Sequence, residues 1–378
     1  MKQVVIFIKN ETVLFVAWTL AFISAVFVKP SGAYFDYIDF RSLGILWSLM
    51  VIMQGLKQNG VFSFVGMRLL AKTKRVWQLA AVLIFLCFFC SMFITNDVAL
   101  ITFVPFAVMM LQACKKEGLM IPVIVLQTVA ANLGSMLTPI GNPQNLYLFG
   151  ISQMSVVEFI CWMLPYTIFS GILLMGCICF LKGKSDPVVP AISERNLLTN
   201  ENGRVRKACV YMGLFVLSLL VVGRVLAYGY MVVIVFVIVF IMEKETIFHV
   251  DYSLLLTFVG FFIFTGNMGK IPAVSSLLQQ MIQGREVFLG VLISQCISNV
   301  PATLLLAGFT EEYKNLLLGV NIGGLGTLIA SMASLISYKI FANTCSKEKG
   351  RYFMHFTVVN VLFLIALLLL YAVCKTEN

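Results

Sequence analysis

Long apolar stretches alternate with short polar ones along the whole chain, and this pattern predicts a bundle of membrane-spanning helices. Runs of about 20 apolar residues fit α-helices that cross a hydrocarbon layer of about 30 Å. We expect spanning helices at residues 12–28, 39–57, 120–150, 156–181, 207–225, 230–243, 252–268, 313–342 and 351–374. Two amphipathic segments, 58–72 and 273–283, are expected at the membrane interface.

Two further apolar segments are interrupted by polar residues and predict re-entrant hairpins. Residues 286–310 contain two short apolar arms around Ser298, Asn299 and Pro301. At 1.5 Å per residue, arms of about ten to twelve residues do not reach across the hydrocarbon core. They can enter the membrane and return on the same side. Residues 77–111 are the matching hairpin in the first half, with Thr95–Asn96–Asp97 at its tip.

The second half of the chain repeats the first at the positions where polar residues interrupt apolar runs. The matched pairs are Asp39 with Asp251, Asn96 with Asn299, Asn132 with Asn321, Gly134 with Gly323 and Thr138 with Thr327, and the separation of the partners decreases along the chain. We therefore expect one repeat at 1–181, a cytoplasmic linker at 182–206 and a second repeat at 207–378. Matched breaks in two apolar halves indicate the midplane binding site of a transporter.

Composition and charge narrow the class and the orientation. The chain is 60% hydrophobic and 12% charged, with a mean hydropathy of +0.96, which excludes an ordinary soluble protein. The net charge of +10 comes from short loops, as the positive-inside rule requires, so we expect a cytoplasmic-membrane protein without a nucleic-acid partner. With the N-terminus in the cytoplasm and the C-terminus outside, 20 of the 27 lysines and arginines face the cytoplasm. The two hairpins then enter from opposite sides, so the repeats are inverted.

Glycines and prolines break both of the longest predicted spans. Gly134, Pro139, Gly141 and Pro143 cannot all lie in one continuous helix without loss of hydrogen bonds. Gly323, Gly324 and Gly326 weaken the second span in the same way, although tight helix packing is an alternative role for them. An unwound midpoint exposes carbonyl groups to cations and helix N-termini to anions. The candidate ligands at these breaks are Thr138, Gly141, Asn142, Asn145, Thr327, Ser331 and Ser334.

The hairpin tips supply the remaining candidate ligands. Asn96 and Asn299 carry amides that can bind a cation by oxygen or an anion by nitrogen, and the hydroxyls of Thr95 and Ser298 precede them. The alternative is that these side chains only satisfy the backbone of a turn. Asp97 is a carboxylate near the bilayer centre and is either part of an ion path or the cap of a helix that starts at Val98. The candidate sodium ligands are Asn96, Asp97 and Asn299.

The hairpin tips, the GNPQN break at 141–145 and the SNVPATLLL segment at 298–306 resemble the ion transporter superfamily. Its members include citrate-transporter-like proteins, divalent anion/sodium symporters, arsenite permeases and a branch of sodium/proton antiporters. The resemblance implies an all-α membrane fold of two inverted repeats, each with a re-entrant hairpin and a discontinuous helix, that moves as an elevator. In the dicarboxylate branch, Ser-Asn-Thr motifs at both tips bind the substrate carboxylate and sodium. Here the asparagine is present in both tips, but Asp97 and Val300 replace the threonine.

We expect a secondary active transporter for a small anionic solute, coupled to H⁺ or Na⁺, and no other cofactor. The partners expected are the solute, the lipid bilayer and a second copy of the chain in a homodimer. The alternatives are arsenite or antimonite efflux, Na⁺/H⁺ antiport and, more distantly, a channel or an intramembrane enzyme. The chain has no GxxxxGK[ST] phosphate loop and no HExxH or GxSxG motif, so we expect neither ATP-driven pumping nor enzyme activity.

Overall fold

The computed structural model describes residues 11–70, 73–181, 183, 185–187 and 201–376, and within them the chain is helical. Only an isolated bridge between Arg75 and Pro187 has strand geometry in this part of the chain. The predicted linker at 182–206 lies largely outside the described residues. In the first half the helices are α2 (Thr12–Phe27), α3 (Tyr34–Tyr37), α4 (Phe40–Gln58), α5 (Val61–Leu70), α6 (Val76–Ser91), α7 (Asn96–Ala113), η1 (Glu117–Leu119), α8 (Met120–Gly134), η2 (Ser135–Leu137), α9 (Pro143–Ser152) and α10 (Val156–Cys179).

The second half of the described chain is also helical. It contains α11 (Glu201–Val222), α12 (Tyr228–Phe248), α13 (Tyr252–Gly269), α14 (Pro272–Ile282), α15 (Glu286–Ile297), α16 (Asn299–Leu306), η4 (Ala307–Phe309), α17 (Tyr313–Ile322), α18 (Met332–Thr344), η5 (Ser346–Glu348) and α19 (Lys349–Thr376). The matched aspartates begin equivalent helices: Asp39 accepts a hydrogen bond from Ser42 N at 3.0 Å, and Asp251 accepts one from Leu254 N at 3.1 Å. Both are N-caps, so the match of these aspartates places α4 and α13 in register.

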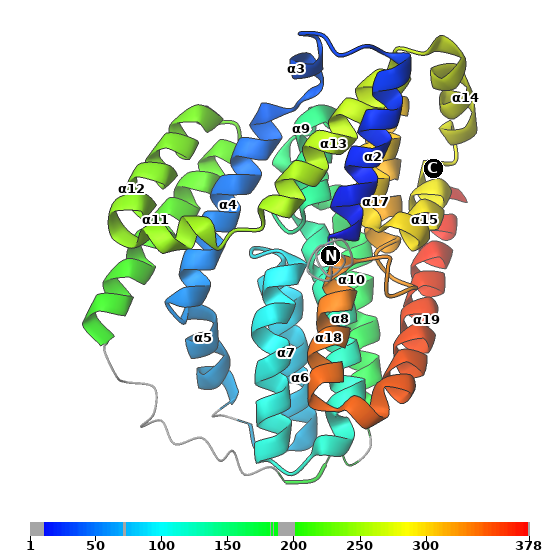
Figure 1. The fold of residues 1–378 in the computed structure, drawn as a ribbon. Coiled ribbons are helices and arrows are strands. Elements are labelled where there is room, and N and C mark those ends of the chain that lie inside the picture. The colour runs from blue at the N-terminus through cyan, green and yellow to red at the C-terminus, as the bar shows by residue number, and fades with distance from the viewer. Residues whose placement is uncertain (1–10, 71–72, 182, 184, 188–200, 377–378) are drawn as a thin grey trace.

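The long helix that precedes each of these capped helices packs on the other half. α2 lies along α13, although α2 belongs to the first half, and α12 lies with α11 along α4 (Figure 1). At the close approach of α2 and α13, a Cβ on Gly260 would lie 3.1 Å from Ala17 Cβ. The two halves are therefore interlocked.

The lengths and compositions of the helices agree with a membrane protein. Among the described residues, six helices or runs of helices are long and apolar enough to span a membrane: α7, η1–α8–η2, α10, most of α11, α13 and η5–α19. The 18 residues of α7 are more than the arms of a short hairpin need, whereas α16, in the matching position, has eight. The helix pair α6–α7 lies in the lower half of Figure 1.

Helix α8 forms the centre of the fold. Nearly all of its side chains are buried, and Gly134 lets it approach α6, because a Cβ there would lie 2.0 Å from Phe88 O. A Cβ on Gly323 would likewise lie 2.8 Å from Ser294 Oγ. This close approach supports the packing role predicted as an alternative for this glycine.

We expect Gly134→Ala to lower the free energy of unfolding by roughly 1–3 kcal/mol or more, because the new methyl overlaps a backbone oxygen that cannot rotate away. Gly176→Ala in α10 is the matched control, since a Cβ there meets nothing within 4 Å and should be neutral or stabilise by up to about 1 kcal/mol. Unfolding of both variants in detergent micelles tests this. Equal melting temperatures would contradict the close packing.

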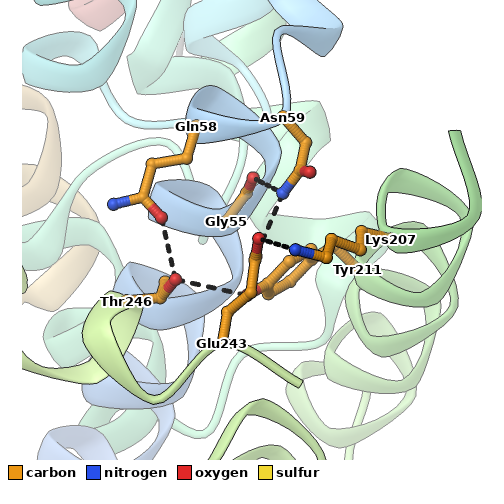
Figure 2. A network of polar contacts seen from close by, with 7 residues as sticks. All are labelled: Gly55, Gln58, Asn59, Lys207, Tyr211, Glu243 and Thr246. Atoms are coloured by element: carbon orange, nitrogen blue, oxygen red, sulfur yellow. Dashed lines mark hydrogen bonds and ion pairs between the residues drawn. The ribbon is translucent and has the colours of Figure 1, made fainter. Parts of the chain in front are cut away.

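Helix α12 is interrupted at Glu243, where the predicted span 230–243 ends. The backbone of Glu243 is non-helical (φ −155°, ψ 67°). Its carboxylate accepts hydrogen bonds from Lys207 at 2.7 Å, Tyr211 at 3.0 Å and Asn59 at 3.1 Å (Figure 2). The Tyr211 ring occupies the space that a Cβ on Gly55 would need. These contacts join α4, α11 and α12, and they fix where the chain turns from α12 into α13.

The orientation of the chain remains a prediction, which cysteine labelling can test. In a background without the ten native cysteines, Gly118→Cys is expected to react with an impermeant thiol reagent only from the cytoplasm. Lys270→Cys is expected to react only from outside. The two positions are exposed and lie at helix ends that are assigned to opposite sides. A cysteine at Val300 that reacted only from the cytoplasm in every transport state would rule out the inverted arrangement.

Candidate substrate and ion site

Both long predicted spans are broken, and the breaks fall at the predicted positions. The first opens after Leu137: Thr138 and Asn142 are extended, and Pro143 starts α9. Proline suits the first turn of a helix because its missing N–H has no partner to lose there. The second opens after Ile322, and extended Ser331 precedes α18.

The two helix-pair tips share a strained conformation. Thr95 has φ 55° and ψ 148°, and Ser298 has φ 76° and ψ 154°. Residues other than glycine rarely adopt these angles, at a cost of about 1–3 kcal/mol each. Asn96 and Asn299 follow as the first residues of α7 and α16. Each amide is therefore placed by a turn of the same backbone conformation. Such strain in equivalent positions favours a functional role over a simple loop.

Asn132 of α8 binds the break in the other half of the chain. Its Oδ1 accepts hydrogen bonds from Asn96 Nδ2 at 2.9 Å and from Ser331 Oγ at 3.0 Å. Its Nδ2 lies 3.3 Å from Ser334 Oγ. Two predicted break ligands and one predicted tip ligand therefore meet at one amide.

Asn321 of α17 repeats this arrangement in the opposite direction. Its Nδ2 donates to Asn145 Oδ1 at 2.7 Å, and its Oδ1 lies 3.4 Å from Asn142 Nδ2. When Asn132 is aligned with Asn321, Asn142 corresponds to Ser331 and Asn145 to Ser334. Each intact half-helix thus binds the break of the other repeat, and the two breaks face each other.

The first break is also tied to the first tip. Thr138 Oγ1 donates to Met92 O, and Asn145 Nδ2 donates to the carbonyls of Ser135 and Thr138, each at 3.1 Å. Gly141 is required by space, because a Cβ would lie 2.0 Å from Ser135 O. Gly141 is therefore a packing residue in this conformation.

The second tip contacts the second break through the backbone. Asn299 N donates to Ala330 O at 2.9 Å, and Ser298 Oγ lies 3.4 Å from the same oxygen. Thr327 is exposed and binds Gln295, at the side of the cluster. The hydrogen bonds of Thr327 therefore go to α15 and not to the asparagines.

Asp97 lies at the first tip, at the edge of a cavity. Because α7 begins at Asn96, Asp97 is its second residue, and the interpretation of Asp97 as the cap of a helix starting at Val98 is wrong. Asp97 Oδ1 is buried and has no hydrogen-bond partner within the described part of the chain. A buried acceptor without a donor is costly, which favours a bound proton or cation.

The cavity beside Asp97 has a volume of about 200 Å³. α4, the first tip and break, the turn between α12 and α13, and α18 form its walls. Its polar and charged lining residues include Thr95, Asp97, Asn142, Lys57, His249 and Asp251.

Sequence reasoning missed three of these site residues. Asn132 and Asn321 had been matched to each other by the repeat but not assigned as ligands, although the match itself was a signal. Gln144 is 1% exposed, and neither of its amide atoms has a partner among the described residues. Asn142 Oδ1 is unpartnered in the same sense. Because Asn142 lines the cavity, its unused amide oxygen indicates a place for a polar ligand.

Arg224, in the loop between α11 and α12, binds the end of α9. It donates to Phe149 O at 3.0 Å and to Gln153 O at 3.2 Å, and it lies over the Phe149 ring at 5.1 Å. The loop between α11 and α12 thereby caps the C-terminus of the half-helix whose N-terminus carries Asn142 and Asn145.

Comparison with known proteins agrees with this architecture. A family model described as citrate transporter matches residues 4–314. The chain belongs to the citrate transporter family. It is 32% identical to an uncharacterized transporter of Methanocaldococcus jannaschii, over 88% of this chain and 89% of the relative. It is also 30% identical to the inner membrane protein YbiR of Escherichia coli, over 80% of each chain. Part of it, 38%, is 32% identical to 29% of the silicon efflux transporter LSI3 of rice, Oryza sativa subsp. japonica. The protein is therefore a multi-pass membrane transporter.

Proposed function

We propose that this protein is a secondary active transporter of the cytoplasmic membrane that moves a small anionic solute, driven by H⁺ or Na⁺. The observation that carries the proposal is the buried cluster in which Asn132 and Asn321 each bind the helix break of the other repeat. Asparagine amides and serine hydroxyls offer both donors and acceptors, so the cluster can exchange its internal bonds for a polar solute.

The cluster offers nitrogen donors that suit an anion and oxygen acceptors that suit a cation. Amide nitrogens and the N-termini of α9 and α18 favour an oxyanion or carboxylate. Amide, hydroxyl and carbonyl oxygens at the tips favour Na⁺, and the Asp97 carboxylate can bind Na⁺ or a proton. Asn96, Asp97 and Asn299 remain our candidate cation ligands.

The crosswise bonds also support elevator-type movement by inverted repeats. Because α8, α9, α17 and α18 hold one another through these asparagines, they can move as one body with the hairpins. α4, α11 and α12 are joined by the Glu243 contacts into a second body. The cavity lies where these two bodies meet, which is where a sliding movement would open and close access.

Uptake into proteoliposomes tests the proposal. We expect labelled citrate, succinate, sulfate or phosphate to accumulate against its gradient when a Na⁺ or proton gradient is imposed, and to leak passively when the gradient is removed. Liposomes without protein are the control. Gradient-independent flux of ions at channel rates would overturn active transport, and failure of every anion to accumulate would overturn the solute class.

A second candidate is the efflux of a neutral hydroxylated solute. The cluster is mostly uncharged, and one relative carries the name of a silicon efflux transporter. Arsenous acid, which is neutral at pH 7, is the probe for this class. Its export in the absence of anion transport would favour the second candidate.

A further inference from the structure

Part of the polar wall of the cavity beside Asp97 has no equivalent in the other half of the described chain. The alignment of Asp39 with Asp251, which cap α4 and α13, also aligns Gln54 with Gly266 and Lys57 with Gly269. The same alignment places His249 on Tyr37. Three wall residues, Gln54, Lys57 and His249, are thus replaced at the equivalent places by two glycines and a tyrosine.

Aromatic side chains fill the equivalent space in the other half. A Cβ on Gly266 would lie 2.3 Å from the Tyr37 ring, so this ring packs directly on the backbone of α13. The Tyr147 ring lies 5.3 Å from that of Phe262 and 6.4 Å from that of Phe258. On the cavity side the corresponding residues are the smaller Ile336, Met50 and Leu46, which line open space.

The tips differ in the same sense. Asp97 lines the cavity, whereas its counterpart Val300 is an apolar side chain that is 8% exposed. The other half has a cavity of about 660 Å³, but the charged side chains that line it are carboxylates, Glu286, Glu311 and Glu312, whereas the cavity beside Asp97 is also lined by a lysine, Lys57. This asymmetry separates the cavity from the shared architecture of the repeats and indicates a function of its own.

Lys57 is the cation of this cavity. It lies in the last turn of α4, is partly buried, and faces a space that Asp97 also lines. Within the described ranges, no carboxylate lies within 4 Å of its ammonium group. The charged or titratable groups that share the cavity are Asp97 on α7 and His249 and Asp251 at the turn into α13, while α9 and α18 contribute none.

The two carboxylates differ from Lys57 in how they are engaged. Asp251 Oδ1 accepts a hydrogen bond from Leu254 N at the N-terminus of α13, whereas Asp97 Oδ1 is buried without a donor. Lys57 has three donors and no ion partner in the described structure. A partly buried ammonium gains most from a ligand that carries a full negative charge, because charge-assisted hydrogen bonds are about twice as strong as neutral ones.

We propose that Lys57 selects the charge of the transported solute, by binding its carboxylate or oxyanion in the cavity beside Asp97. The inference rests on the proposed transport function and specifies the residue that distinguishes an anion from a neutral hydroxylated molecule. The amides of Asn142 and its neighbours then bind the rest of the solute.

Binding to the purified full-length protein tests this proposal. The stability of the folded protein is titrated with citrate, sulfate and arsenous acid at constant ionic strength, because only ligands that bind the folded state raise it. For an anion that binds the wild type, Lys57→Met is expected to raise the Kd by about tenfold or more. Lys57→Arg keeps the charge and is expected to stay within about threefold. Lys339→Met, at an exposed lysine of α18, is the matched control and should leave the Kd unchanged.

The outcomes separate this inference from the function on which it rests. If Lys57→Met binds the anion as tightly as the wild type, whereas Asn142→Ala does not bind it, Lys57 has no role and the transport function stands. If Lys57→Met changes only the response to Na⁺, its charge balances Asp97 and the proposal is wrong. If the wild type binds arsenous acid and no anion, both this inference and the anionic class of solute fall.

Discussion

Asn96→Ala and Asn299→Ala are each expected to abolish gradient-driven transport while leaving most of the protein folded. Each amide is the first residue of a helix that follows a strained tip, and each is buried in this conformation. Loss of Asn96 removes one bond to Asn132, which keeps its bond to Ser331, so the stability cost should be only about 1 kcal/mol. We expect uptake in proteoliposomes to fall at least about 100-fold, since a ligand that acts in binding and movement contributes more than one hydrogen bond.

Asn315→Ala is the control for both variants. Asn315 lies on α17 and makes one long contact, at 3.5 Å, to Glu312 at the surface. It should transport and melt as the wild type does. Normal uptake by both tip variants would place the binding site elsewhere, whereas loss of folded protein in parallel with uptake would assign the amides to stability.

Asp97→Asn is expected to uncouple or abolish transport and to flatten its dependence on external pH or Na⁺. The substitution keeps the shape of the side chain and removes only its ability to bind a proton or carry a charge. The carboxylate faces the cavity with an unpartnered oxygen, so it can exchange a cation as access changes. The measurement is the initial rate of uptake across imposed proton and sodium gradients, with rates compared at matched protein content.

Asp36→Asn, at an exposed aspartate of α3, is the matched control and should keep the wild-type response. If Asp97→Asn also keeps that response, Asp97 is not the coupling residue. Coupling would then rest on amide, hydroxyl and carbonyl oxygens, which bind Na⁺ but do not titrate near neutral pH, and sodium would be favoured over protons.

The aromatic contacts between α9 and α13 indicate that the two halves have different roles in the proposed movement. Tyr147, Phe258 and Phe262 hold the first break against α13 at the place where the other half leaves a cavity. In the proposed movement, these contacts would have to separate when access changes side. Arg224, which holds the end of α9 from the α11–α12 loop, would have to release it in the same step.

The sequence alone determined the class of the protein, most of its helices, both helix breaks and both tips. These features are local. Apolar runs of sufficient length form helices in a membrane, and Pro143 or a run of glycines removes helix hydrogen bonds whatever surrounds it. The internal repeat added the equivalence of Asn96 with Asn299 and of Asp39 with Asp251, and the two aspartates indeed cap equivalent helices.

Only the tertiary structure decided which polar groups meet. Asn132 and Ser331 are far apart in the chain, and nothing in their local sequence states that each asparagine binds the opposite repeat rather than its own. The start of α7 at Asn96, the break of α12 at Glu243 and the capping role of Arg224 also depend on partners from other helices. The cavity is the clearest case, because Lys57 and Asp97 share it only where packing leaves space, and the same backbone arrangement in the other half is filled by aromatic rings.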